Sequence, residues 1–237
     1  MAAITQSANV IVDDFIAPVC HEHIKIIYQD EALLVINKPS GLLSLSGKNS
    51  LNWDSVHYRL VNGQQGKTAA FAEAKLPHRL DFGTSGIMLV ALNSESAKNL
   101  NQQFQSHTIS KRYVAMLQGK VCDNHGQINY PIAKDKLYFP RVKLCNTTGK
   151  AALTHYTVLK RFIQPIKTLV QFTPVTGRTH QLRIHSHAIG HPILGCDLYK
   201  SEQSEQMASR LQLHASDIYF HHPSTQKPMH LHCASPF

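Results

Sequence analysis

The chain has 237 residues, of which 43% are hydrophobic and 16% are charged, a balance that excludes a disordered protein and is typical of a soluble globular one. Lysine and arginine outnumber aspartate and glutamate by 24 to 15, for a formal net charge of +9. This excess favours an anionic partner, with a merely basic soluble protein as the alternative. The longest apolar run, residues 87–92, is too short to cross a bilayer, and the N-terminus lacks the basic start of a signal peptide, so we expect a cytoplasmic protein.

The first quarter of the chain predicts an arm, a hairpin and a short helix. Residues 1–23 lack periodicity, so we expect a partly ordered arm before a single domain over residues 24–237. Apolar runs on both sides of Asp30-Glu31 predict two strands of a hairpin. Residues 51–61 predict a helix, and residues 64–73 predict a loop.

A dense apolar segment, residues 87–92, predicts a strand buried on both faces. A helix should follow it, because Asn93 or its neighbour can cap the first turn. Ala97, Leu100 and Phe104 repeat at the helical spacing.

The second half of the chain predicts further strands with one helix among them. Thr179 can cap this helix, and Gly190 can end it. Strands dominate and follow one another without regular strand–helix–strand units, so we predict an α+β fold with a mixed, largely antiparallel sheet. The predicted strands cover residues 111–121, 153–162 and 167–175, with one or two more in residues 210–233.

One acidic residue stands out in "PHRLDFGTSGIMLVAL" at 77–92, where Asp81 follows a basic pair and precedes a small-residue turn. Its side chain is open to three interpretations: a structural aspartate that caps the turn, a metal ligand or a catalytic carboxylate. The two glycines of the turn would let a ligand approach the backbone closely or let the backbone adopt a positive φ. An arginine from elsewhere, Arg178 or Arg183, could keep the carboxylate ionised.

Two other motifs are basic. In "KRYVA", Lys111 and Arg112 precede Tyr113, a combination that suits phosphate contact with base stacking but also fits an ordinary strand. In "TGRTHQLRIH", Arg178 lies just before a helix N-terminus, where a phosphate could bind. A solvated basic face explains this second motif equally well.

Cysteine and histidine patterns disfavour a metal site. The five cysteines are widely spaced without a CxxC pair, so we expect reduced thiols that lie away from the three motifs. Close histidines occur, as in "HLHC" at 230–233, but without the spacing of a zinc finger or a metalloprotease. A second acid for glycosidase chemistry does not accompany Asp81 in its motif.

Together the motifs resemble the ordered signature of the RluA family of pseudouridine synthases: "HRLDFGTSG" at 78–86, "KRYVA" at 111–115 and "TGRTHQLRIH" at 176–185. The flanking "YQDEALLVINKPSGL" at 28–42 agrees, and the likeness extends over residues 24–237. Many family members carry an N-terminal S4 RNA-binding domain, for which residues 1–23 are too short.

The resemblance implies isomerisation of uridine to pseudouridine in RNA, without a cofactor or a metal. It makes Asp81 the essential carboxylate, which either attacks covalently or removes a sugar proton. Tyr113 would stack on the uracil and assist proton removal at C5, and Arg183 would form an ion pair with Asp81. Leu213 would line the pocket, and Arg79 would fill the gap left by a flipped uridine. The other motif residues expected to contact RNA are His78, Thr84, Ser85, Lys111, Arg112, Arg178, His180 and Gln181.

Within the family, the chain most resembles members that modify stem-loops of both 23S rRNA and tRNA. Its compact length, "TGKAALTHY" at 148–156 and the ending "CASPF" carry this likeness. The alternative is the same chemistry on only one of the two RNAs. We expect a monomer whose partner is RNA and not a membrane. A non-catalytic RNA-binding protein and a metal-dependent hydrolase of nucleic acid are the competing hypotheses.

Overall fold

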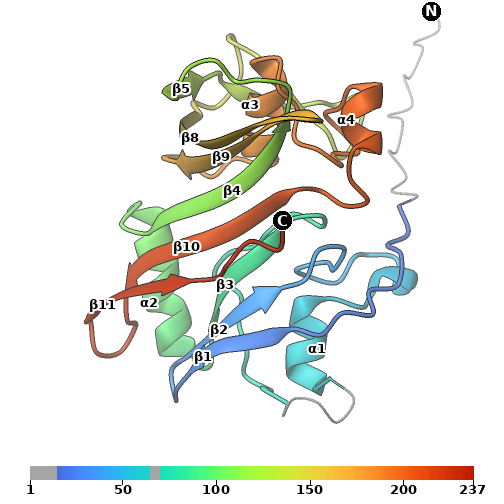
Figure 1. Cartoon of the computed structure of the whole chain (residues 1–237). Helices are drawn as coiled ribbons and strands as arrows, with labels where there is room; N and C mark the ends of the chain where they lie inside the picture. Colours follow the sequence, from blue (N-terminus) through green and yellow to red (C-terminus); the bar gives the residue numbers. More distant parts are fainter. Residues whose placement is uncertain (1–14, 65–69) are drawn as a thin grey trace, which may run out of the picture.

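A nine-stranded sheet organises the part of the chain that the computed structural model describes, residues 15–64 and 70–237. Its order is β1-β2-β3-β10-β4-β9-β8-β5, with β11 paired to β10 (Figure 1). Neighbouring strands are antiparallel, except that β3 and β10 are parallel. The mixed, largely antiparallel sheet with few helices confirms the predicted α+β class. The elements are β1 (Lys25–Gln29), β2 (Leu33–Lys38), the 3-10 helix η1 (Ser50–Asn52), α1 (Val56–Asn62), β3 (Ser85–Ala91), α2 (Ser94–Gln105), β4 (Ser110–Gln118), β5 (His125–Asn129), β6 (Ile132–Lys134), β7 (Val142–Leu144), β8 (Leu153–Ile163), β9 (Ile166–Pro174), α3 (Gln181–Ala188), α4 (Glu202–Gln206), β10 (Leu213–His221) and β11 (Pro228–His232).

The N-terminal end of the sheet is covered on both faces, which explains its uninterrupted apolar strands. On β2, Leu33 and Val35 pack in a cluster with residues of α2, whereas Leu34 and Ile36 pack in a cluster with residues of α1. All seven residues of β3 are buried, as predicted for residues 87–92.

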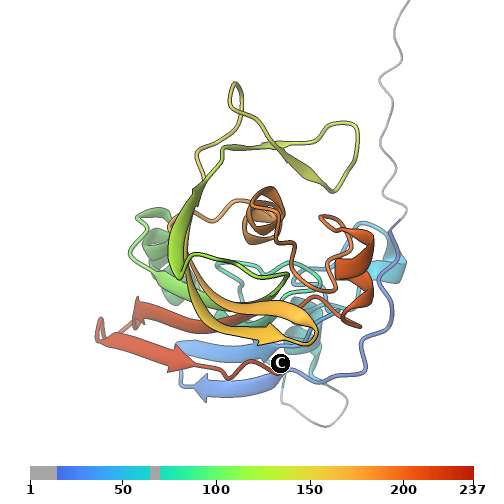
Figure 2. The same ribbon diagram turned by 45° about the horizontal axis from the view of Figure 1, so that its top comes forward.

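The other end of the sheet carries a third apolar cluster, to which β4, β9 and α3 contribute. Tyr113 on β4 packs against this third cluster and also against the cluster that contains Leu34, Ile36 and residues of α1. Its ring therefore lies where the two halves of the molecule meet. The separate β6–β7 hairpin stands beyond α3, in olive yellow at the top of Figure 2.

Strand β10 joins the two halves. Its His214 and Ala215 pair with Ser85 and Gly86 of β3, while its other edge pairs with β4. From Asp217 onward, β11 pairs with β10. Residues that lie 129 positions apart in the sequence are therefore adjacent in the sheet.

The predicted helices are present with two changes at their ends. Asn93 caps α2 as expected, because its side chain accepts a hydrogen bond from the Ser96 amide. The helix predicted over residues 51–61 begins later, at Val56, after Ser55 caps it. The loop predicted over residues 64–73 lies partly outside the described residues.

The predicted capping of α3 by Thr179 is wrong. The N-cap residue is His180, in the left-handed conformation with φ 54° and without a side-chain capping bond. The preceding turn is closed instead by Gln181, whose amide oxygen accepts from the Arg178 amide at 3.0 Å. The helix ends as expected, with Gly190 at φ 80°.

Only the end of the predicted arm can be described, since residues 1–14 lie outside the described part. Residues 15–23 form neither helix nor strand. The Asn52 side chain binds the Phe15 carbonyl at 2.6 Å and the Ala17 amide at 2.8 Å, which fixes this segment beside η1. None of the described helices is long and apolar enough to span a bilayer.

Candidate active site

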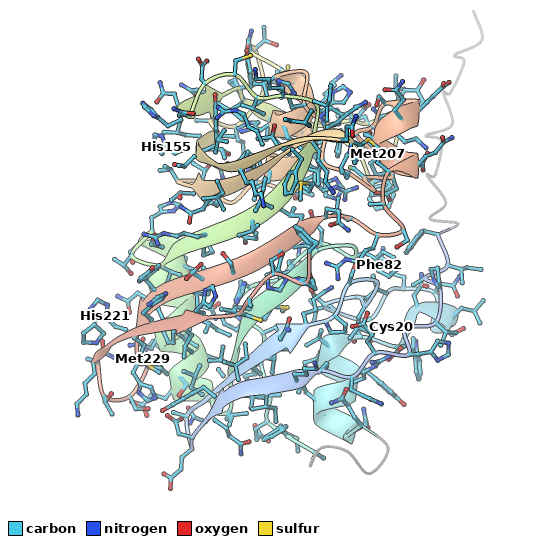
Figure 3. The ribbon with its side chains drawn as sticks, viewed as in Figure 1. Cys20, Phe82, His155, Met207, His221 and Met229 are labelled. Carbon is cyan, nitrogen blue, oxygen red and sulfur yellow. The ribbon has the colours of Figure 1, made fainter. Side chains whose placement is uncertain are left out.

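A pocket of about 340 Å³ brings together residues of all three sequence motifs. Its size lies at the lower end of the range for small-molecule sites and suits a single nucleotide base with its sugar. Of the predicted site residues, only Ser85 and Arg112 do not line it. Figure 3 labels Phe82, the neighbour of Asp81, at the level where the two halves of the molecule meet.

A cradle of hydrogen bonds fixes the turn that carries Asp81. Residues 38–44 bind the backbone on both sides of it: Ser44 donates to the Leu80 carbonyl at 2.7 Å, and Ser40 donates to the Gly83 carbonyl at 2.7 Å. The amide of Gly41 donates to the Phe82 carbonyl at 2.9 Å. Because these bonds use the main chain of the turn, they leave the Asp81 carboxylate free to face the pocket.

Lys38 is the buried centre of this cradle, and sequence reasoning missed it. Its ammonium donates to the carbonyls of Pro39, Phe82 and Thr84 at 2.8, 3.1 and 2.9 Å, so all three of its protons have acceptors. Burial lowers the pKa of Lys38 to about 7, and the nearby charge of Asp81 opposes this shift. A lysine at the end of the otherwise apolar strand "LLVINK" was the available signal, since a fully buried lysine needs partners.

The glycines of the turn have a packing role in the structure, and Gly86 adopts the positive φ that the sequence allowed for. A Cβ on Gly86, which has φ 114°, would lie 2.3 Å from the Ala215 carbonyl oxygen of β10. A Cβ on Gly83 would lie 3.0 Å from Leu211 Cβ. Gly86 therefore lets the chain lie against β10, and Gly83 lets the turn lie against Leu211, which precedes that strand.

Ser85, predicted to contact RNA, is buried in a polar chain behind the pocket. Its hydroxyl accepts from Arg210 at 2.6 Å and lies 2.8 Å from His214 Nδ1, while His214 Nε2 lies 3.2 Å from the Cys233 carbonyl. Since the carbonyl can only accept, the proton of the neutral ring lies on Nε2 and Ser85 donates to Nδ1. These hydrogen bonds link β3, β10 and the C-terminal segment, so Ser85 has a structural role.

The buried hydrogen bonds around Ser85 and His214 make the stability of the folded protein sensitive to acid. Burial lowers the pKa of His214 from 6.5 to about 4, so between these pH values the unfolded chain binds a proton that the folded chain does not. We therefore expect the free energy of unfolding to fall as the pH drops from 7.5 to 5, with about 2 kcal/mol due to His214. Urea denaturation at both pH values would show a smaller pH dependence for His214→Gln than for the wild type. Equal pH dependence in the two proteins would contradict this assignment.

Strand β4 presents its motif residues alternately. Lys111 and Tyr113 line the pocket, whereas Arg112 projects from the opposite face and lies over the ring of Tyr219 at 5.1 Å. Arg112 therefore lies outside the pocket, and its expected contact with RNA stays a prediction. Burial raises the pKa of Tyr113, and the charge of Asp81 raises it further, so the phenol is neutral. Burial also lowers the pKa of Lys111.

Arg183 is buried at the pocket wall but does not form the expected ion pair with Asp81. Among the described residues its ion pair is with Asp197, and the same nitrogen lies 3.4 Å from the buried thiol of Cys196. One cysteine thus does contact a motif residue, contrary to expectation. The Asp81 carboxylate still contributes to raising the pKa of Arg183, so the two charges interact without direct contact. Arg183 Nε is buried without a hydrogen bond to any described residue.

The His180 ring faces Asp81, with Nε2 4.0 Å from the carboxylate. Its Nδ1 lies 3.0 Å from the Tyr199 hydroxyl, which accepts from the Val142 amide at 2.7 Å. Burial lowers the pKa of His180, so the ring is neutral. Donation from Tyr199 to Nδ1 leaves the ring proton on Nε2, facing Asp81.

The remaining predicted residues divide into structural and accessible ones. Gln181 is buried, and its amide bonds to the backbone and side chains of residues 153–154 and 176–178. His78 accepts from the Leu89 amide at 2.9 Å, and burial lowers its pKa to about 3. Arg79 and Arg178 are exposed at the pocket rim. The buried lining includes Thr84 and Leu213.

No three side chains of histidine, cysteine, aspartate or glutamate in residues 15–64 and 70–237 are grouped as metal ligands would be. The close histidines of the sequence have other partners: His222 binds Asp30 at 2.7 Å, and His230 and His232 both bind Asp217 at 3.0 Å.

Comparison with known proteins identifies the family. A model described as RNA pseudouridylate synthase matches residues 32–188. The chain is 42% identical over 212 residues to the dual-specificity RNA pseudouridine synthase RluA of Yersinia pestis, covering 90% of this chain and 99% of that one. It is 44% identical over 206 residues to the protein of the same name from Haemophilus ducreyi, covering 86% and 89%.

Solved structures agree with this result. Human RNA pseudouridylate synthase domain containing 1 has a TM-score of 0.75 and 27% identity, covering 93% of this chain and 86% of that one. Human RNA pseudouridylate synthase domain containing 4 has a TM-score of 0.68 and 26% identity, covering 90% and 88%. The chain that holds Asp81 over this pocket therefore belongs to the RluA family of RNA pseudouridine synthases.

Proposed function

We propose that the protein isomerises uridine to pseudouridine in stem-loops of both 23S rRNA and tRNA, as a cytoplasmic monomer. The observation that carries the proposal is the Asp81 carboxylate, which a main-chain cradle holds at the wall of a nucleotide-sized pocket beside Tyr113 and Arg183. The names of its relatives, dual-specificity RNA pseudouridine synthases, support the pair of substrates.

The reaction begins with removal of the target uridine from its stack, since C1′ cannot be reached inside a helix. Arg79 is suited to occupy the vacated space, because its side chain is exposed at the rim of the pocket and forms no hydrogen bond with any described residue. The cost of unstacking is a few kcal/mol and is smaller in a loop than in a stem.

Chemistry follows at C1′ in the pocket. The N1–C1′ bond breaks, the uracil turns, and the C5–C1′ bond forms, after which C5 loses a proton and N1 carries one. Asp81 acts on the sugar, by covalent attack or by proton removal. The buried guanidinium of Arg183 interacts with this carboxylate without direct contact, and Lys38, whose pKa burial lowers to about 7, lies behind the turn.

Tyr113 packs its ring against the uracil. Its raised pKa keeps the hydroxyl protonated in the empty site, so the resting enzyme offers a neutral ring and an O–H donor. Removal of the C5 proton by the phenolate requires that its pKa fall once the uridine is bound. Lys111 and Arg178 lie at the pocket and are placed to neutralise phosphates beside the flipped nucleotide.

The test is release of tritium from C5-labelled uridine in two minimal transcripts, a tRNA anticodon stem-loop and a 23S rRNA stem-loop. We expect turnover of both, because one pocket accepts one flipped uridine and RNA loops present their bases unstacked. Turnover of one transcript only would limit the proposal to that RNA. Turnover of neither would reject it, and turnover that a chelator abolishes and magnesium restores would favour a metal-dependent enzyme.

A further inference from the structure

The ring of His180 is directed at the acid of the pocket. Its Nε2 lies 4.0 Å from the Asp81 carboxylate, and among the described residues no other histidine, lysine or arginine nitrogen lies within 4.0 Å of that carboxylate. Arg183, which the sequence placed beside Asp81, pairs with Asp197 instead. His180 is therefore the basic side chain that is best placed to act on the Asp81 carboxylate directly.

The backbone of His180 has a conformation that few residues other than glycine adopt. Its φ is 54° and its ψ is 17°, in the left-handed region. His180 is the N-cap residue of α3, yet its side chain forms no capping hydrogen bond. Such backbone conformations occur preferentially at functional sites. In this case the conformation leaves the ring free of the helix end and lets it line the pocket.

A buried tyrosine determines which nitrogen of the His180 ring carries the proton. The Tyr199 side chain is buried, and its hydroxyl accepts from the Val142 amide at 2.7 Å and lies 3.0 Å from His180 Nδ1. Burial raises the pKa of Tyr199 to about 12, so the hydroxyl keeps its proton. Among the described residues, Nδ1 is the only acceptor within hydrogen-bond distance of that hydroxyl. A ring with its proton on Nδ1 would leave the tyrosine proton buried without a partner, which is unfavourable. The favoured tautomer therefore carries its proton on Nε2, facing Asp81.

The surroundings of the ring also keep it neutral. Burial lowers the pKa of His180 against the opposing charge of Asp81, and the charge of Arg183 lowers it further. Both Arg141 and Arg183 lie over the neighbouring Tyr199 ring, at 5.7 and 5.6 Å. A neutral imidazole beside these cations can donate a hydrogen bond to Asp81 without neutralising the carboxylate.

We propose that His180 is a positioning residue for Asp81, and that the Tyr199 hydroxyl holds the His180 ring in the tautomer that this role requires. When the flipped uridine fills the pocket, the Nε2–H group donates to one carboxylate oxygen, so that the other oxygen faces the sugar. Hydrogen bonds of this kind are often long in an empty site and shorten when the substrate binds. His180 keeps its proton throughout, so the proton balance of the isomerisation is unchanged. This inference rests on the proposed function for the identity of the reaction.

The first experiment compares His180→Gln with His180→Asn in tritium release from the anticodon stem-loop. The amide nitrogen of glutamine reaches the place of Nε2, whereas that of asparagine reaches only the place of Nδ1. We expect kcat of the glutamine variant within about fivefold of the wild type and kcat of the asparagine variant lower by about 10–100-fold, the scale on which orienting groups act. KM should stay within about threefold in both, since the substrate itself loses no contact. Asparagine adopts the left-handed conformation more readily than glutamine, so a purely structural role of His180 predicts the opposite order of the two rates. That order would overturn the proposal.

The second experiment is Tyr199→Phe, which keeps the ring and removes the hydroxyl. We expect kcat to fall about tenfold with KM within about threefold, because the tautomer of His180 is then no longer fixed. The matched control is Tyr219→Phe, which removes the hydroxyl of a tyrosine that stacks on His230, with ring centroids 4.1 Å apart, outside the pocket lining. It should keep kcat within about twofold. Melting temperatures ensure that every variant is assayed folded. A rise in KM at unchanged kcat in Tyr199→Phe would overturn the proposal, since the hydroxyl would then only anchor Val142.

The tautomer itself is read from long-range nitrogen–proton correlation spectra of protein with isotope-labelled histidine. The chain has 16 histidines, and the signals of His180 are those that disappear in His180→Gln. We expect the Nε2–H tautomer in the wild type and in Tyr219→Phe, and a mixture of both tautomers in Tyr199→Phe. An Nδ1–H ring or an imidazolium in the wild type at neutral pH would overturn the proposal. The spectra need no turnover, so they decide the tautomer even for a protein that releases no tritium, a result that would reject the proposed function.

Discussion

We expect Asp81→Asn to lower the rate of pseudouridine formation by at least about 10³-fold, the scale on which an essential catalytic group acts. The bonds that position the turn involve its main chain, so asparagine should take the same place with no charge and no nucleophilic oxygen. Affinity for the stem-loop should stay within a few-fold. Tritium release under single-turnover conditions, together with anisotropy binding, measures both quantities.

A matched control for charge is Asp217→Asn on β10, which removes one carboxylate from the same sheet at a site paired with His230 and His232. It should retain turnover within about twofold, because this carboxylate does not line the pocket. If the Asp81 variant kept a tenth of the wild-type rate, Asp81 would not be the catalytic group.

The second large effect is expected for Arg183→Met, which should lower kcat about 10²–10³-fold. Methionine keeps much of the apolar volume but removes a buried cation whose charge reaches Asp81. A loss of this size corresponds to about 3–4 kcal/mol of transition-state stabilisation, the scale on which one preorganised charged group acts at a reacting centre. Rates at saturating RNA and melting temperatures separate a catalytic effect from unfolding.

Asp197→Asn is the control for Arg183. Its carboxylate is the ion-pair partner of Arg183, but its side chain is 67% exposed, and exposed pairs contribute little. We expect activity within about threefold of the wild type, the range of a pair worth under 1 kcal/mol. If both variants lost activity equally, Arg183 would act by anchoring residues 196–197 and not through its charge at Asp81.

The apolar periodicity of the chain was sufficient to predict most of the sheet and α2. Each face of a strand or helix that is buried against the core requires apolar side chains, and these recur at the spacing of that element. It could not predict which strands become neighbours. The parallel pairing of β10 with β3 depends on Gly86, because the absence of a Cβ leaves room for the Ala215 backbone. The local sequence around Gly86 does not indicate which strand will pair there.

The motifs identified the pocket residues well, since eleven of the thirteen predicted side chains line it. The motifs were misleading where a polar side chain is buried and forms hydrogen bonds inside the protein. Ser85 looks like part of a polar turn, yet it begins β3 and bonds to His214. Lys38 looks like the end of an exposed strand, yet it is fully buried under the turn that carries Asp81. Hydroxyl and ammonium groups have no periodicity that distinguishes a ligand contact from an internal bond.

The place of β10 in the sheet has a consequence for protein synthesis. The turn with Asp81 is made in the first half of the chain, whereas the strand against which it packs begins at Leu213. Strand β10 must therefore leave the ribosome before β3 gains its second neighbour and before Leu213 joins the wall of the pocket. Pairing over such a long sequence separation is slow to form. The nascent chain consequently cannot complete the pocket, and we expect it to be inactive on RNA, until β10 has been synthesised and has paired with β3.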